Sequence, residues 1–125
     1  MSPPAPPSGP LVQVFGAPDS QPTRAALRFF KERRLDVHFV DIGRKPMAPG
    51  ELRRFVERLG AGALADTEGR RWRDAGLGYL SIPDADLADR LLRDQRLLKI
   101  PLVRVANGFA AGRDEAAWKA LVGAR

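Results

Sequence analysis

The 125-residue chain contains no cysteine and only one histidine. Without cysteine, the protein cannot build a disulfide, a thiolate metal site, a thiol relay or a cysteine nucleophile from its own side chains. The histidine, His38, has no second ligand at metal spacing, so we expect no metal site and predict a structural role in a strand. No apolar run approaches the ~20 residues that a transmembrane helix needs, so we expect no membrane partner.

Length and charge limit the function classes further. A second hydrophobic core would leave each half of so short a chain too small, which points to one domain. The formal net charge is +6, but the sequence has no block of five like charges and no basic motif interleaved with aromatic residues. We therefore predict a solvated basic surface, including Arg70, Arg71 and Arg73, and no specific nucleic-acid partner.

The first ten residues differ in composition from the rest. Residues 1–10 contain five prolines and no charged side chain, and they lack the apolar stretch of a signal peptide. This composition predicts a disordered, partly polyproline tail followed by a domain over residues 11–125. We expect the protein in the cytoplasm.

The segment after this tail predicts a strand, a helix and a second strand. Leu11 to Phe15 is an apolar, β-branched run, and Val37 to Ile42 is another. Between them, Asp19 and Ser20 are cap candidates for a helix that ends near Arg34. Short links in this order imply a right-handed crossover and a parallel pair of strands.

Helical patterns dominate the middle of the chain. Pro49 opens a helix with Gly60 as its stop, and a short helix is expected around residues 72–76 within an irregular stretch. Ser81 with Asp84 resembles a capping arrangement for a helix from about Pro83 to Asp94. We expect Trp72 in this region, like Trp118 later, to be a packing residue.

The last part predicts a hairpin and a closing helix. Leu102 to Ala106 forms the third strand, Asn107-Gly108 the turn, and Phe109 to Ala111 the return strand. Asp114 then caps a helix with Trp118 on its inner side. Together, a βαβ half and a ββα half predict an α/β fold of the thioredoxin-like class, with a four-stranded mixed sheet flanked by helices.

Four segments in order resemble the arsenate reductase family, which includes ArsC, Spx and YffB types. Residues 17–24 (Ala-Pro-Asp-Ser-Gln-Pro-Thr-Arg) stand where the family has Asn-Pro-x-Cys-x-x-Ser/Cys/Thr-Arg. Residues 66–77 resemble its Asn-Thr-x-Gly-x-x-x-Arg-x-x-Gly-Leu stretch, residues 97–103 its Leu-x-Arg-Pro-Ile-Val motif, and residues 112–115 its turn before the last helix. The resemblance covers about Leu11 to Val122 and implies a helical insertion of the arsenate reductase type.

The chain departs from this family at the residues that reduce arsenate. Such an enzyme needs a low-pKa thiolate at a helix N-terminus, and Ser20 stands where that cysteine belongs. Pro22 removes a backbone donor, Asp19 adds a negative charge, and Ile100 replaces the arginine before the family proline. Arsenate reduction by the thiol route is therefore not expected.

The resemblance implies a set of candidate site residues, each with a structural alternative. Ser20 is the candidate catalytic residue, as a hydroxyl that steadies the thiolate of glutathione, and its structural alternative is a helix cap. Thr23 and Arg24 match the family motif, although neither needs a ligand to explain it. Pro101 corresponds to the family proline with a cis peptide bond, and Arg113 either lines an oxyanion site or is a solvated turn residue.

Two functions remain open on these residues. The first is a redox-inactive binding or regulatory module, with a protein partner suggested by Spx-like relatives that bind RNA polymerase through this fold. The second is a glutathione-dependent oxidoreductase or transferase in which Ser20 steadies the thiolate of the ligand. Apart from glutathione as this small thiol ligand, we expect no cofactor.

Overall fold

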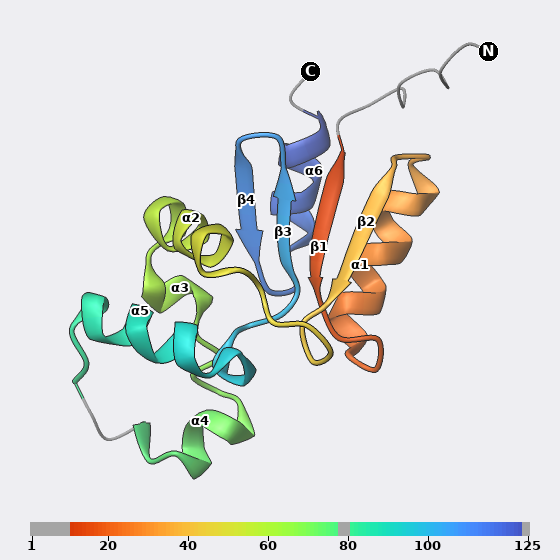
Figure 1. Ribbon diagram of the computed structural model, residues 1–125. Helices are drawn as coiled ribbons and strands as arrows, with labels where there is room; N and C mark the ends of the chain where they lie inside the picture. Colours follow the sequence, from red (N-terminus) through yellow and green to blue (C-terminus); the bar gives the residue numbers. More distant parts are fainter. Residues whose placement is uncertain (1–10, 78–80, 124–125) are drawn as a thin grey trace.

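The computed structural model describes residues 11–77 and 81–123, so the tail predicted for residues 1–10 lies outside it. A four-stranded sheet has the order β2-β1-β3-β4 (Figure 1). The strands are β1 (Val12–Gly16), β2 (Val37–Asp41), β3 (Leu102–Val105) and β4 (Gly108–Ala111). Strand β1 is parallel to β2 and antiparallel to β3, which is antiparallel to β4, so the predicted mixed sheet is confirmed.

One face of the sheet packs against the first and last helices. These are α1 (Gln21–Glu32) and α6 (Glu115–Gly123), which lie together behind the strands in Figure 1. Alternate residues of the central strands point to them because side chains alternate across a strand. Val14 and Val103 join Phe30 and Trp118 in this cluster, and both aromatic side chains are fully buried.

The other face carries the helical insertion. Its elements are α2 (Pro49–Leu59), α3 (Ala61–Leu64), α4 (Arg70–Asp74), α5 (Asp84–Arg93) and the 3-10 helix η2 (Gln95–Leu97). Phe15 and Leu102 from the sheet share one cluster with Phe55 of α2 and with Leu64 and Leu91 of the insertion. The helices α3, α4 and α5 lie beside the sheet in Figure 1.

Several local predictions are confirmed. Gly60 ends α2 with φ at 84°, a left-handed conformation that glycine adopts without strain. The Asp114 carboxylate accepts a hydrogen bond from the backbone N–H of Ala117 at 3.0 Å, as a cap of α6. Trp72 and Trp118 are both buried, so both are packing residues.

The predicted turn of the hairpin is wrong by one residue. Val105 pairs with Gly108, so the two turn residues are Ala106 and Asn107, and Ala106 has φ at 53°. Gly108 belongs to β4 instead, where a Cβ atom would collide with the side chain of Leu121. The glycine is therefore explained by close packing of α6 on the strand and not by the turn.

The capping arrangement predicted from Ser81 and Asp84 is also wrong. The helix α5 has Pro83 at its N-cap, with no side-chain cap hydrogen bond. Ser81 lies two residues before this N-cap, and Asp84 is the first residue of the helix. Asp84 and Asp86 instead place carboxylates in the first turn, where the helix dipole favours negative charge.

No helix in residues 11–77 and 81–123 is long and apolar enough to cross a membrane.

Candidate functional site

Ser20 is the N-cap of α1. Its backbone is extended (φ −79°, ψ 122°), and its Oγ accepts a hydrogen bond from the backbone N–H of Thr23 at 3.2 Å. Its own N–H donates to the carbonyl of Ala17 at 3.1 Å, which closes the turn after β1. The side chain is only half-buried, so the hydroxyl proton remains available to a ligand.

Thr23 fixes the loop from inside. The residue is fully buried, and its Oγ1 accepts from the backbone N–H of Ala17 at 3.4 Å. A Cβ atom at Gly16 would collide with the Thr23 side chain, so the strand end can approach the helix only as glycine. Thr23 thus positions the β1–α1 loop. Because its hydroxyl is buried and bonded to the loop, Thr23 is explained by this structural role without a ligand.

Pro101 lies beside this loop. Phe15 pairs with Leu102, so the end of β1 and the start of β3 are neighbours in the sheet. The Ile100–Pro101 peptide is cis, as the family resemblance implies, and the Pro101 carbonyl accepts from the N–H of Gly112 at 2.9 Å. The first, third and fourth family-like segments therefore meet at one end of the sheet.

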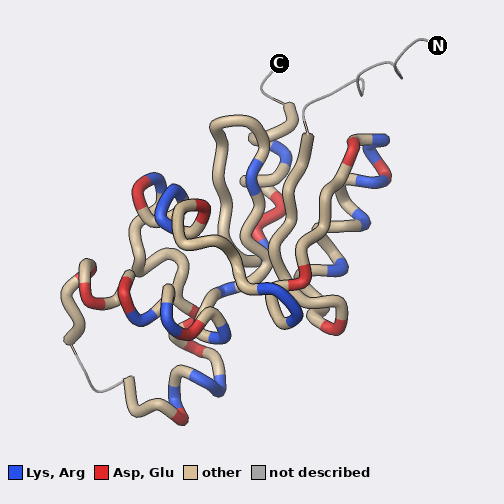
Figure 2. The backbone as a smooth tube through the Cα atoms, in the orientation of Figure 1, with Lys and Arg blue, Asp and Glu red and all other residues tan. Residues whose placement is uncertain are grey.

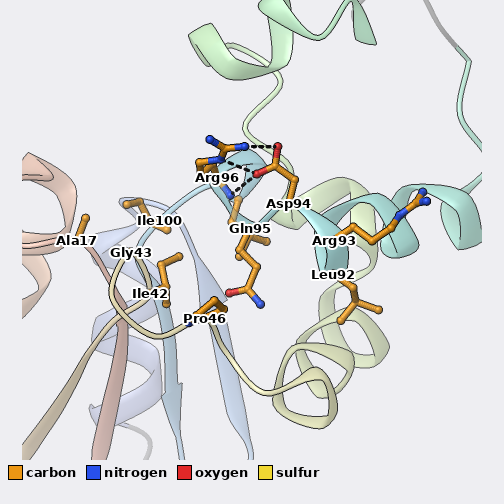
Figure 3. Close-up of a pocket in the computed structure, with 11 residues that line it drawn as sticks. Ala17, Ile42, Gly43, Pro46, Leu92, Arg93, Asp94, Gln95, Arg96 and Ile100 are labelled. Atoms are coloured by element: carbon orange, nitrogen blue, oxygen red, sulfur yellow. Dashed lines mark hydrogen bonds and ion pairs between the residues drawn. The ribbon is translucent and has the colours of Figure 1, made fainter.

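A cavity of about 530 Å³ opens at this end, between the sheet and the helical insertion (Figure 3). Ala17 and Ile100 form its wall on the sheet side. The loop between β2 and α2 and the segment from α5 to η2 complete it. The apolar lining residues are Ala17, Ile42, Pro46, Leu92, Leu98 and Ile100.

The polar residues of the cavity are largely engaged with the protein itself. Gln95 Oε1 accepts from the Met47 N–H at 2.8 Å, and Gln95 Nε2 donates to the Met47 carbonyl at 2.9 Å. Arg96 Nε lies 2.9 Å from Asp94 Oδ1 (Figure 3). This hydrogen bond from Arg96 lowers the pKa of the Asp94 carboxyl below its usual value, and burial opposes the shift only partly. The charge of Arg96 is therefore matched inside the site.

The two candidate arginines lie apart from the cavity lining. Arg24 is exposed on α1. Arg113 is about half exposed, and its Nη2 lies 3.5 Å from Glu115 Oε2. Arg24 lies one helical turn after Ser20, and Arg113 follows Gly112, whose N–H bonds to the Pro101 carbonyl. None of the five candidate site residues lines the cavity; their neighbours Ala17 and Ile100 do.

His38 and the acidic residues of the described segments do not gather at this site. His38 lies exposed on β2, in register with Gln13 of β1, as expected for a strand residue. Among the described residues, no group of three His, Cys, Asp or Glu side chains could hold a metal. What the site offers is a partly buried serine at a helix N-terminus and an apolar cleft next to it.

Sequence reasoning missed most of the cavity wall. Leu92, Leu98 and Ile42 were recognisable only as apolar positions, and Gln95 pairs with a residue 48 positions away in the chain. Ile100 was the exception, because it replaces an arginine of the family motif. That replacement is the signal that the site is apolar.

Fold and site together define a thioredoxin-like protein of the arsenate reductase type that has no thiol. The model of the ArsC family matches residues 15–121, and the chain belongs to this family. Among solved structures, the YFFB protein is 16% identical, with a TM-score of 0.79 over 89% of this chain and 98% of its own. Arsenate reductase from Vibrio cholerae is 16% identical, with a TM-score of 0.76 over 90% of this chain and 98% of its own.

A third structure is the ArsC family related protein from Bacteroides fragilis. It is 17% identical, with a TM-score of 0.79 over 88% of this chain and 96% of its own. At these identities the structural likeness establishes the fold alone. No curated protein matches the chain.

Proposed function

We propose that this ArsC-family protein is a redox-inactive binding or regulatory module whose cleft receives an apolar group of its partner. The observation that supports this most is the combination of Ser20 as a helix cap with an apolar cleft beside it. No thiol exists anywhere in the chain to perform the redox step. A binding role needs no thiol.

The lining favours an apolar group over an oxyanion. Binding an anion requires donors that are free to replace its water, since burying a charge without partners is costly. In this cleft Arg96 already pairs with Asp94, and the Gln95 amide is used by Met47. The third basic or amide side chain of the lining, Arg93, donates its Nε–H to the Asp89 carbonyl at 3.4 Å. An apolar group, in contrast, would gain roughly 25 cal/mol per Å² of surface that it buries with Ile42, Leu92 and Ile100.

The occupant that we propose is a side chain of a protein partner. Spx-like proteins, which the sequence resembles, bind RNA polymerase through this fold, so partner binding is compatible with the scaffold. A cytoplasmic location is part of the same proposal.

The test is partner capture with a cleft variant. Pro46→Asp places a carboxylate in the cleft from an exposed position, so the fold should tolerate it. Leu11→Asp is the matched control, because Leu11 is an exposed large apolar residue, at 45%, outside the cleft. We expect the wild type and Leu11→Asp to retain the same protein and Pro46→Asp to lose it, as measured by quantitative mass spectrometry. Equal retention by all three baits, or no partner, would contradict the proposal.

The second candidate is a glutathione-dependent oxidoreductase or transferase. It is favoured by one observation, the half-exposed Ser20 hydroxyl, which accepts from Thr23 and keeps its own proton to donate to a ligand thiolate. Isothermal titration with glutathione decides between the two. Micromolar to millimolar binding that weakens in Ser20→Ala would favour the enzyme, and no detectable heat would remove it.

A further inference from the structure

A second cavity, of about 260 Å³, lies where α2 meets the β3–β4 hairpin. It shares no residue with the cleft described above. Its lining consists of Arg54, Glu57, Arg58, Arg104, Asn107 and Phe109, which is three arginines and one acidic residue. Figure 2 shows the basic positions on α2 and on the neighbouring β3.

Two residues that line this cavity, Phe109 and Arg104, are held in place by neighbours outside the lining. The Phe109 ring packs edge-on against Phe55, with 4.8 Å between the centroids. Arg104 Cζ lies 5.2 Å from the Phe109 centroid, and Arg104 Nη1 lies 2.8 Å from Glu51 Oε2. Both side chains of this ion pair are about four-fifths buried, with 18% and 20% exposed. Arg104 is therefore held in place and its charge is matched.

The two α2 arginines are in a different situation. Arg58 Cζ lies 5.6 Å from the Phe109 ring centroid, the same ring that Arg104 contacts. Two positively charged groups therefore lie around one aromatic side chain. Arg54 and Arg58 are four residues apart on one helix, a spacing at which like charges repel. Neither forms an ion pair in the part of the chain that the structure describes. The cavity mouth thus carries positive charge that only Glu57 offsets.

We propose that this cavity binds a phosphate-type oxyanion, as inorganic phosphate or the phosphate of a small monoester. Arg54 and Arg58 supply charge-assisted N–H donors, and the Asn107 amide can add a neutral one. Phosphate is favoured over a carboxylate because it carries about −1.5 to −2 charges near neutral pH and can satisfy both arginines despite Glu57. Its binding relieves the repulsion between the guanidinium groups.

The test is a titration of the isotope-labelled full chain with inorganic phosphate at constant ionic strength, followed by NMR. We expect amide shifts confined to α2 and residues 104–109, and weaker shifts with acetate at equal concentration. In the double variant Arg54→Gln/Arg58→Gln the affinity should fall about tenfold or more, since charge-assisted hydrogen bonds are the strong ones. Arg53→Gln, an exposed α2 residue that does not line the cavity, is the matched control and should bind like the wild type.

Thermal unfolding gives a second, independent readout. Phosphate should raise the Tm of the wild type and of Arg53→Gln more than that of the double variant. Without phosphate, the double variant should melt no lower than the wild type, because the substitutions remove two arginines that repel each other. Equal shifts with acetate, or equal loss in Arg53→Gln and in the double variant, would overturn the proposal while leaving the cleft proposal untouched.

Discussion

At position 20 one oxygen atom stands where the arsenate reductase family has sulfur, and its surroundings are those of a helix cap. The Ser20 Oγ accepts from the Thr23 N–H, and the Ser20 N–H closes the loop on Ala17. Serine is among the best N-cap residues because its short side chain reaches an unpaired backbone donor. The residue thus has a structural use with no ligand present.

Removal of this cap tests that use. Ser20→Ala should lower the free energy of unfolding by about 1 kcal/mol, because the Thr23 N–H loses its partner. Ser20→Asp should retain most of the stability, since aspartate caps equally well and its charge suits the helix dipole. Urea unfolding measures both values. If the two variants lost the same stability, capping would not be the role of this hydroxyl.

At the level of elements, the hairpin and the last helix are packed against each other with no space left at Gly108. The glycine sits on β4 where a Cβ atom would meet Leu121 of α6. Gly50, in the first turn of α2, has open space around it. The two glycines therefore offer opposite expectations for the same substitution.

Gly108→Ala should destabilise the protein by about 1–3 kcal/mol, the usual cost of overpacking. Adding Leu121→Ala should make the double variant lose less than the sum of the two single variants, because the collision is removed. Gly50→Ala should be neutral or stabilising, because alanine is a better helix former than glycine. Denaturant unfolding provides all four values, and an additive double variant would show that α6 does not press on the strand.

At the level of the whole molecule, segments of the helical insertion that are far apart in the chain are tied to one another by a few long-range contacts. The backbone N–H of Lys99 donates to the Leu64 carbonyl at 2.7 Å, and that of Asp66 donates to the Leu97 carbonyl at 2.9 Å. The Gln95 amide then connects η2 to the loop before α2 through Met47. These contacts keep the two walls of the cleft at a fixed separation.

Gln95→Ala should loosen the contact between η2 and the loop before α2, two segments that line the cleft. The Met47 N–H and carbonyl lose their partners, so we expect about 1–3 kcal/mol less stability and faster hydrogen exchange at the Met47 amide. Gln95→Glu should be intermediate, because a carboxylate can accept from the N–H but cannot donate to the carbonyl. Gln21→Ala, at an exposed position on α1, is the control and should leave the exchange at Met47 unchanged.

The sequence by itself determined the order of the four strands, both ends of α2, the start of α6, the burial of both tryptophans and the loss of thiol chemistry. Each depends on local signals: apolar periodicity, a glycine stop, an aspartate cap, or the identity of one residue. The four family-like segments also led from the sequence to the ArsC family.

The tertiary structure alone decided the shape and chemistry of the two cavities and the place of the hairpin turn. Gln95 and Met47, or Glu51 and Arg104, are about fifty residues apart in the chain, and no local pattern predicts that they meet. Gly108 looks like a turn residue until α6 is packed against it. Local propensity sets the elements, whereas contacts between distant segments set what their side chains can bind.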